Sequence, residues 1–435
     1  MRAMTDLRPL KRHRGWIRLA MWGAYAALML AAPLLWRSSF ALTMLSQMGI
    51  AIIVCLAYNV LLGQGGMLSF GHAVYSGLGA YLAIHTLNRV AAGDLALPVS
   101  LVPLAGGAAG LLFAALLGYV TTRKAGTSFA MITLGIGELV WSLALMLPEF
   151  FGGEGGISAN RVVGPPVLGI SFGPQIELYH LIAIYCFICT AALYAFTRTP
   201  LGRILNAVRD NPERVEFIGY STRSVRWLAF MVSGLFAGIG GGLAALNFEI
   251  VTAEVLGAAR SGAYLLFVFL GGAGFFVGPI IGAVLMVIAL VLLSELTAAW
   301  LLYLGLVFVV MVVAAPGGIA SLVMANGRIV AAGQMRALLG GYLALGGSAL
   351  AALAGGSVLI EMLYHRQLDA AAPGPTLNHL GVALDVTSVD SWIGAAWLTL
   401  VGAGLFELCR RPFARQWQAA QLAIEDQIRR RGELP

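Results

Sequence analysis

Long apolar runs separated by short polar breaks dominate this chain. A helix that crosses a bilayer needs roughly 20 mainly apolar residues, within a range of about 17 to 25. By this measure the sequence predicts about twelve spans, at 19–36, 40–62, 73–91, 98–120, 126–147, 179–197, 228–247, 261–276, 278–296, 299–315, 337–360 and 391–409. Because the run 261–276 is short and meets the next run at a tight glycine-rich join, we expect a broken or re-entrant element there.

Composition supports a membrane protein. Of the 435 residues, 59% are hydrophobic and 11% are charged, whereas a soluble domain carries about 25% charged residues. The net charge of +7 fits basic loops on one side of a bilayer, so it predicts no nucleic-acid partner. The four cysteines lie in or beside apolar segments; Cys186 and Cys189 form a C-x-x-C, but no second pair accompanies it, so the sequence predicts no metal site or redox motif. The fold class expected is an all-α polytopic membrane protein.

The distribution of basic residues predicts the topology. With the N-terminus inside and alternating spans, 22 Lys and Arg residues fall in inside segments and 5 in outside segments, which together make the 27 of the chain. The outside residues are Arg37, Arg89, Arg161, Arg260 and Arg366. Positive charge collects on the cytoplasmic side, so we expect both termini in the cytoplasm and an even number of spans. The basic start has no cleavage site after its apolar run, which predicts an uncleaved first helix.

The most polar stretch is Arg198–Trp227, which holds six Arg, one Asp and two Glu among thirty residues. Thr199 followed by Pro200 predicts the start of a helix that runs to about Val208. Asn211 followed by Pro212 predicts a second helix in the same way. Two interpretations stay open for the stretch: a solvated loop that only fixes the topology, and a docking surface for a soluble partner.

A second stretch, Tyr58–Ala83, places polar side chains between two apolar runs, and Gly63, Gly65, Gly66, Gly71 and Gly77 interrupt its helix pattern. Irregular backbone at membrane depth needs surrounding protein or a water-filled cavity, and broken helices build substrate sites in transporters. The polar residues are Asn59, Gln64, Ser69, His72, Tyr75 and Ser76. The alternative is a cytoplasmic turn between two ordinary helices, with His72 as a satisfied polar residue.

Glu138 falls near the middle of the run 126–147. A carboxylate at that depth costs several kcal/mol unless it is paired, protonated or hydrated. One interpretation is a group that faces a pore or orients a helix. The other is a neutral structural group in an interhelical hydrogen bond.

Glycines at four-residue spacing predict close helix packing. They form the sets Gly234, Gly238 and Gly242; Gly274, Gly278 and Gly282; and Gly106 and Gly110.

The chain carries no recognisable catalytic set. Its only lysines, Lys11 and Lys124, are not followed by Ser or Thr, so it has no P-loop for ATP. The six histidines show no metal-ligand spacing, and no G-x-S-x-G occurs. We therefore expect neither an enzyme nor a cofactor in this chain.

Five segments in order resemble a known family. They are LLGQGGMLSFGHAVYSGLGAY, TLGIGELVW, FGGEGGI, PLGRILNAVRDNPERVEFIGY and FLGGAGFFVGPIIGA. Together they are similar to the M-type permease subunit of the high-affinity branched-chain amino acid ABC importers. The resemblance covers about residues 40–322 and implies a permease core of about ten spans.

The resemblance also implies partners. In such importers a periplasmic binding protein delivers substrate to two homologous permeases, and two cytoplasmic ATPase subunits hydrolyse the ATP. The stretch 198–227 would then dock to an ATPase. The positions that match the family pattern are Gly202, Arg203, Arg209, Asp210, Asn211, Glu213 and Gly219. We expect Arg203, Arg209, Asp210 and Glu213 to make the polar contacts, and the substrate pathway to include Asn59, Gln64, Ser69, His72, Tyr75 and Glu138.

Three parts are expected along the chain: a basic first helix at 1–39, the permease core at 40–322 with its outside loop at 148–178, and an extension at 323–435 with two spans and a basic tail. The stretch 316–336 is interpreted as the boundary. Localisation in a bacterial inner membrane is implied by the resemblance. Several functions stay open: amino-acid import, import of urea or short amides by a relative of the same family, an ion-coupled secondary transporter, and a membrane scaffold or sensor.

Overall fold

The computed structural model describes residues 9–36, 38–163, 171–367, 376–379 and 381–430. These residues are mainly helical, with two short two-stranded sheets, which confirms the all-α polytopic class. They belong to two compact units. Unit 1 lies within Met1–Val291 and Met311–Ala320, and unit 2 lies within Leu292–Val310 and Ser321–Pro435. Part of the predicted outside loop 148–178, residues 164–170, lies outside the described residues.

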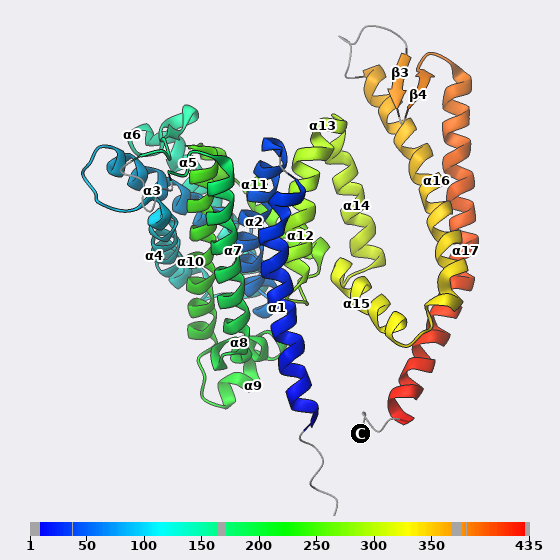
Figure 1. The fold of residues 1–435 in the computed structure, drawn as a ribbon, viewed down its shortest axis with the longest axis horizontal. Helices are drawn as coiled ribbons and strands as arrows, with labels where there is room; N and C mark the ends of the chain where they lie inside the picture. The colour runs from blue at the N-terminus through cyan, green and yellow to red at the C-terminus, as the bar shows by residue number, and fades with distance from the viewer. Residues whose placement is uncertain (1–8, 37, 164–170, 368–375, 380, 431–435) are drawn as a thin grey trace, which may run out of the picture. The chain divides into compact units, whose positions relative to one another are not determined.

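The elements follow one another along the chain as a series of helices with short turns (Figure 1). Up to the end of α12 they are α1 (Pro9–Leu35), α2 (Ser39–Asn59), the π-helical turn η1 (Val60–Gln64), α3 (Ala73–Ala91), the 3-10 turn η2 (Val99–Leu101), α4 (Val102–Thr121), α5 (Gly126–Met146), α6 (Pro148–Phe151), the 3-10 turn η3 (Gly153–Gly155), β1 (Ile157–Ser158), α7 (Gln175–Arg198), α8 (Pro200–Asp210), α9 (Pro212–Phe217), α10 (Thr222–Phe248), β2 (Ile250–Val251), the 3-10 turn η4 (Ala253–Leu256), α11 (Ala258–Gly271) and α12 (Gly278–Val287). The later elements are the π-helical turn η5 (Ile288–Leu293), α13 (Ser294–Leu296), α14 (Trp300–Ala314), α15 (Gly318–Ala331), α16 (Met335–Gln367), β3 (Thr376–His379), β4 (Val382–Asp385) and α17 (Val389–Arg430).

Each of the twelve predicted apolar runs falls on a helix. Among the described residues, eight helices are long and apolar enough to cross a membrane, or nine if the bent pair α14 and α15 forms one span. The apolar part of α1, Leu19–Leu35, is at the lower limit of a span, and α11 is shorter still. The number twelve therefore stays a prediction, whereas the expected short element at 261–276 is confirmed as the 14-residue helix α11.

The core of unit 1 forms where α10 packs against α2, α3 and α4. The predicted glycine contacts are confirmed there: a Cβ on Gly110 would collide with the carbonyl oxygen of Gly234, and one on Gly238 with that of Gly106. Close backbone approach of this kind needs residues without a side chain. The prediction is wrong for Gly274, which has open space around it and no close neighbour.

Unit 1 has its polar helix pair at one end. Figure 1 shows α8 and α9 at one end of the bundle formed by α7 and α10, and α6 at the other. Near α6, the strands β1 and β2 pair in antiparallel register, with Ile157 opposite Val251 and Ser158 opposite Ile250. The bundle therefore presents two chemically different ends, one with charged helices and one with short turns.

Unit 2 is built around the antiparallel packing of α16 with α17. The hairpin of β3 and β4 connects them, with Leu377 opposite Leu384. Near the far end of this pair, Ile329, Leu338 and Ala420 are buried under the aromatic rings of Tyr342, Phe413 and Trp417. The helix α15 covers most of the stretch 316–336, and the two units divide within it, between Ala320 and Ser321. The boundary at 322 itself stays a prediction.

Candidate functional site

The polar stretch 198–227 forms the two short helices that its caps predict. The hydroxyl of Thr199 accepts a hydrogen bond from the backbone N–H of Gly202 at 3.2 Å and starts α8. The amide oxygen of Asn211 accepts from the backbone N–H of Arg214 at 3.0 Å and starts α9. Each proline at the first helical position sets the backbone angle that a helix needs. The first helix ends at Asp210, slightly beyond the predicted Val208.

The helix α8 lies against η1, where the regular α-helix of α2 ends. The side-chain amide of Asn206 donates to the amide oxygen of Gln64 at 2.9 Å. The guanidinium of Arg209 donates to the carbonyl oxygen of Gly63. A Cβ on Gly66 would collide with the side chain of Arg209, so only glycine allows this approach. The two polar stretches that the sequence distinguishes therefore meet in the structure.

The seven predicted coupling residues divide into two kinds. Arg203 and Glu213 are exposed, and the structure gives their side chains no hydrogen-bond or ion-pair partner among the described residues. The others are used inside the chain. Arg209 pairs with Asp210 at 3.0 Å, Asn211 caps α9, Gly202 is buried against the carbonyl of Phe196, and Gly219 takes a φ of +88° after α9.

The sequence analysis did not identify the apolar side chains at the end of α9 as part of a contact surface. Phe217, the last residue of α9, is 90% exposed, and Ile218, which follows it, is 69% exposed. Exposed aromatic and aliphatic groups beside charges are typical of a protein contact surface. The signal was present in the sequence as two adjacent apolar residues, Phe217 and Ile218, within the charged loop.

The segment between η1 and α3 runs back along the end of α2. The hydroxyl of Tyr58 donates to the carbonyl oxygen of Ser69 at 2.8 Å. The backbone N–H of Phe70 donates to the hydroxyl of Thr133 at 3.1 Å, and that of Ala73 donates to the hydroxyl of Ser261 at 3.0 Å. Irregular backbone is thus held inside protein, as a bilayer requires.

The predicted pathway residues of this segment are deeply buried. Asn59, Ser69, His72 and Tyr75 are at most 2% exposed, and the ring of His72 lies between those of Tyr58 and Tyr75. Within the described part of the chain, the amide oxygen of Asn59, the hydroxyl of Ser69 and both ring nitrogens of His72 have no protein partner. Buried polar atoms of this kind commonly bind water. Gln64 does not belong to this group, because its amide oxygen accepts a hydrogen bond from Asn206 of α8.

Glu138 lies elsewhere, on an exposed face of α5. Met131 is 65% exposed and Leu139 is 57% exposed on the same helix, while the opposite face packs through Gly137 against Gly71. The described residues offer Glu138 no hydrogen-bond or ion-pair partner. The interhelical bond considered for this carboxylate does not form within the described chain. The structure therefore does not bring Glu138 together with the polar groups around His72.

No group of three or more metal-ligating side chains occurs among the residues that the structure describes.

A family comparison identifies most of the chain. The model of the family described as branched-chain amino acid transport system / permease component matches residues 40–315.

Curated relatives agree with this match. The high-affinity branched-chain amino acid transport system permease protein LivM of Escherichia coli (strain K12) is 29% identical over 293 residues, which cover 62% of this chain and 67% of that protein. The protein of the same name from Salmonella typhimurium is 30% identical over the same shares. The nucleoside ABC transporter permease protein NupC of Lactococcus lactis is 26% identical over 206 residues, or 43% of this chain and 63% of that protein. No solved structure matches the chain.

Proposed function

Because this chain belongs to the family of branched-chain amino acid transport system permease components, we propose that it is the transmembrane permease subunit of an ATP-driven ABC importer. Its substrates are branched-chain or related amino acids. The chain itself hydrolyses no ATP. It converts the movement of ATPase subunits into alternating access across the membrane.

The observation that carries this proposal is the bonding of α8 to η1. A docking element must be rigid to transmit a push, and side-chain caps with prolines stiffen both α8 and α9. Through Asn206 and Arg209 the pair is tied to the end of α2. Movement of α8 therefore displaces the break between α2 and α3, next to the buried polar groups.

The docking surface combines charge with apolar area. Arg203 and Glu213 supply exposed charges of opposite sign, and Phe217 supplies an exposed aromatic ring. Arg209 and Asp210 contribute indirectly, since they join α8 to the membrane-spanning part. Four residues were expected to make polar contacts with the ATPase. By this assignment, Arg203 and Glu213 contact it directly, and the other two do not.

The partners follow from the same role. They are two cytoplasmic ATPase subunits, a second homologous permease and a periplasmic binding protein. An apolar helix face that carries Glu138 cannot rest in hydrocarbon without a large cost. Glu138 therefore faces the second permease or a hydrated pathway between the two permeases. The end of unit 1 with α8 and α9 is cytoplasmic, the end with β1 and β2 is periplasmic, and both chain termini are in the cytoplasm of a bacterial cell.

The test is purification from the native membrane followed by reconstitution. We expect two ATPase chains and a second permease to accompany this chain in mild detergent. Proteoliposomes of that complex should import leucine, isoleucine or valine only with ATP and the binding protein, and vanadate should stop the import. Uptake that survives ATP depletion but collapses with an uncoupler would replace this proposal with an ion-coupled transporter.

A further inference from the structure

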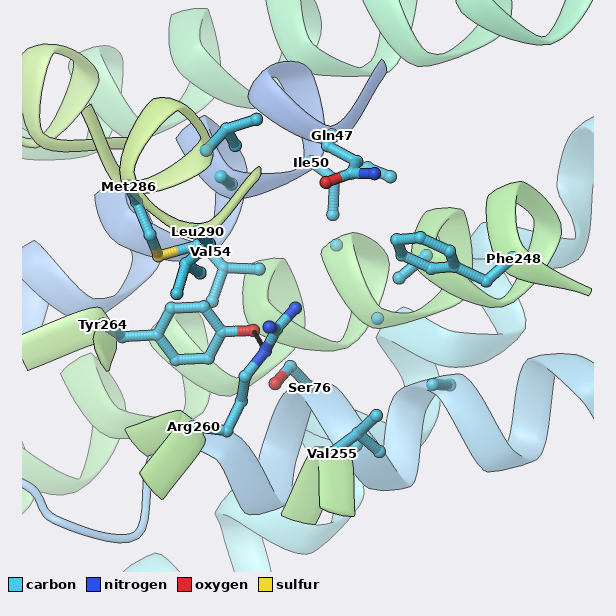
Figure 2. A pocket seen from close by; sticks show the side chains of 17 residues that line it. Gln47, Ile50, Val54, Ser76, Phe248, Val255, Arg260, Tyr264, Met286 and Leu290 are labelled. Carbon is cyan, nitrogen blue, oxygen red and sulfur yellow. Dashed lines mark hydrogen bonds between the residues drawn. The ribbon is translucent and has the colours of Figure 1, made fainter. Parts of the chain in front are cut away.

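The arginines of unit 1 lie in different surroundings. Arg161 and Arg209 each form an ion pair with a carboxylate. Arg260 lies beside Tyr264 in a cavity among α2, α3, α10, α11 and α12 (Figure 2), and its Nε donates to the hydroxyl of that tyrosine at 3.2 Å. The arrangement at the end of α4 differs from both, because two arginines there share one tyrosine ring.

The shared ring belongs to Tyr119 in the last turn of α4. The guanidinium carbon of Arg123, just beyond the end of that helix, lies 5.0 Å from the ring centre. That of Arg223, in the first turn of α10, lies 4.5 Å from the same point. These two distances keep the guanidinium groups closer together than the screening length of about 10 Å at 0.1 M salt. Because arginine stays charged at any physiological pH, the two cations repel each other at this ring.

The packing of α4 against α10 fixes the position of Tyr119. The ring of Trp227 meets it edge-on, with centroids 5.8 Å apart. The indole Nε1 of Trp227 donates to the carbonyl oxygen of Ala115 at 2.9 Å. A Cβ on Gly118 would collide with the ring of Phe230, so the two helices approach each other closely here. Both helices therefore hold the ring that carries the two arginines.

No carboxylate of the described chain neutralises this pair of cations. None of the ion pairs among the described residues includes Arg123 or Arg223. Glu216, the acidic residue nearest to Arg223 in the sequence, accepts a hydrogen bond from the hydroxyl of Thr222 at 2.7 Å instead. The Nη2 of Arg223 is buried and has no hydrogen-bond partner within the described part of the chain. Buried donors in proteins normally have an acceptor, so the site is short of an anionic acceptor.

A phosphate group matches what is missing. A guanidinium presents its N–H donors in a flat fork that fits two oxygens of a phosphate, and the hydrogen bonds are strengthened by the charges. One phosphate placed between Arg123 and Arg223 would accept from both and would also offset their mutual repulsion.

The surface beside the arginines indicates that this phosphate belongs to a lipid. Leu112, Leu116 and Val120 follow one another at four-residue spacing on α4, and each is more than half exposed. Residues at this spacing lie on one face of a helix, and α4 is within a segment long and apolar enough to cross a membrane. Tyrosine, tryptophan and arginine at the end of such a helix are typical of the headgroup level of a bilayer. Acyl chains below the phosphate would cover the aliphatic face, whereas a soluble anion would leave it bare.

From this geometry we infer that Arg123, Arg223 and Tyr119 form a binding site for the phosphate of an anionic phospholipid whose acyl chains lie along α4. Basic pockets between membrane helices bind lipid headgroups in this way. The site lies where α10 begins, shortly after α9 ends, so the bound lipid stabilises the start of α10 next to the proposed docking helices. The inference goes beyond the proposed function, since it concerns neither the transported substrate nor the ATPase.

The test measures lipid binding to the protein as purified from its native membrane, in micelles of an uncharged detergent. No charged membrane surface contributes under these conditions. Native mass spectrometry during titration with dioctanoyl phosphatidylglycerol gives the dissociation constant, and glycerol phosphate serves as a competitor without acyl chains. Arg123→Gln and Arg223→Gln each remove one cation of the site. Arg198→Gln is the matched control, because Arg198 lies over the ring of Tyr194 at 4.8 Å near the end of α7.

We expect phosphatidylglycerol to bind saturably, and Arg123→Gln and Arg223→Gln each to weaken its binding about tenfold, the scale of one lost hydrogen bond between charged groups. Arg198→Gln should bind as the wild type does. Dioctanoyl phosphatidylcholine should bind more weakly than phosphatidylglycerol, because its choline group cancels the charge of the phosphate.

Three results would overturn the inference. The first is unchanged binding in both site variants, or an equal loss in Arg198→Gln, which would indicate a general effect of positive charge. The second is full displacement by glycerol phosphate at equal concentration, which would make the ligand a soluble phosphate. The third is an absence of saturable binding to the wild type, as expected if a protein subunit covers the two arginines.

Discussion

The guanidinium of Arg209 on α8 donates a hydrogen bond to the carbonyl oxygen of Gly63 in η1, across 146 positions of sequence. This bond connects the polar stretch 198–227 with the point where the α-helix of α2 stops. A π-helical turn leaves backbone carbonyls without their usual intrahelical partners, so a side-chain donor can bind one there. The contact therefore joins a side-chain donor to a backbone carbonyl that needs one.

Arg209→Ala removes this bond and the pair with Asp210. We expect the complex to assemble and hydrolyse ATP, but uptake should fall by roughly tenfold, because a charge-assisted hydrogen bond contributes about 1.5–3 kcal/mol. Transport and ATP hydrolysis in the same proteoliposomes provide the measurement. Arg214→Ala is the control, since it removes an exposed arginine from the neighbouring α9. Equal uptake in wild type and Arg209→Ala would rule out transmission through this contact.

Charge reversal at the surface tests docking separately. Arg203→Glu should release the ATPase subunits during purification, because the exposed Arg203 would contact them directly. Lys124→Glu makes the same change of charge at another exposed position on the same predicted side and should leave the complex intact. The readout is the ratio of ATPase to permease in the purified complex. Retention of the ATPase by Arg203→Glu, together with normal uptake, would remove this residue from the docking surface.

Accessibility tests the place of Glu138. In a chain with Cys409→Ser, the remaining cysteines are buried, so Glu138→Cys adds one reactive position. A charged, membrane-impermeant thiol reagent should modify it in the assembled complex, and ATP with substrate should change the rate. Ile188→Cys on α7, exposed in the isolated chain, is the control for a position away from α5. Complete protection of Glu138→Cys in every state would show a dry interface instead of a hydrated pathway.

A carboxylate also organises unit 2. Thr297 and Tyr303 both donate to the same oxygen of Glu361 on α16, the latter at 3.0 Å. Glu361→Ala leaves both hydroxyls without this acceptor, so the local structure should lose about 2 kcal/mol. Hydrogen exchange of peptides around 297–303 and 355–365 should accelerate accordingly. Glu361→Gln keeps an acceptor and should lie between the wild type and Glu361→Ala; unchanged exchange in Glu361→Ala would contradict the role.

The local signals in the sequence predicted local structure well. The caps at Thr199 and Asn211 were correct because capping depends on residues within three positions of each other. Glycine spacing predicted the packing at Gly110 and Gly238 in the same way. Glycines four residues apart lie on one face of a helix, and such a face lets another helix approach closely.

The sequence could not predict which distant segments of the chain come into contact. Nothing in the pattern around Arg260 indicates that its side chain lies close to Ile50 and Val54 of α2, and its place on the outside stays a prediction. The contact of Arg209 with Gly63 likewise depends on how two separate polar stretches fold together. The sequence analysis also missed Phe217, because the spacing of apolar residues along a helix does not show which of them is exposed.

The length of α17 has a mechanical consequence. At about 1.5 Å per residue, its 42 residues extend roughly 60 Å, twice the hydrocarbon thickness of about 30 Å. Its apolar first half ends near the charged pair Arg410 and Arg411, and its second half is held by packing of Phe413, Trp417 and Ala420 against Ile329, Leu338 and Tyr342. The charged half of α17 is therefore fixed within unit 2, and a pair of spin labels near its two ends would measure a separation of roughly 60 Å if the helix stays continuous.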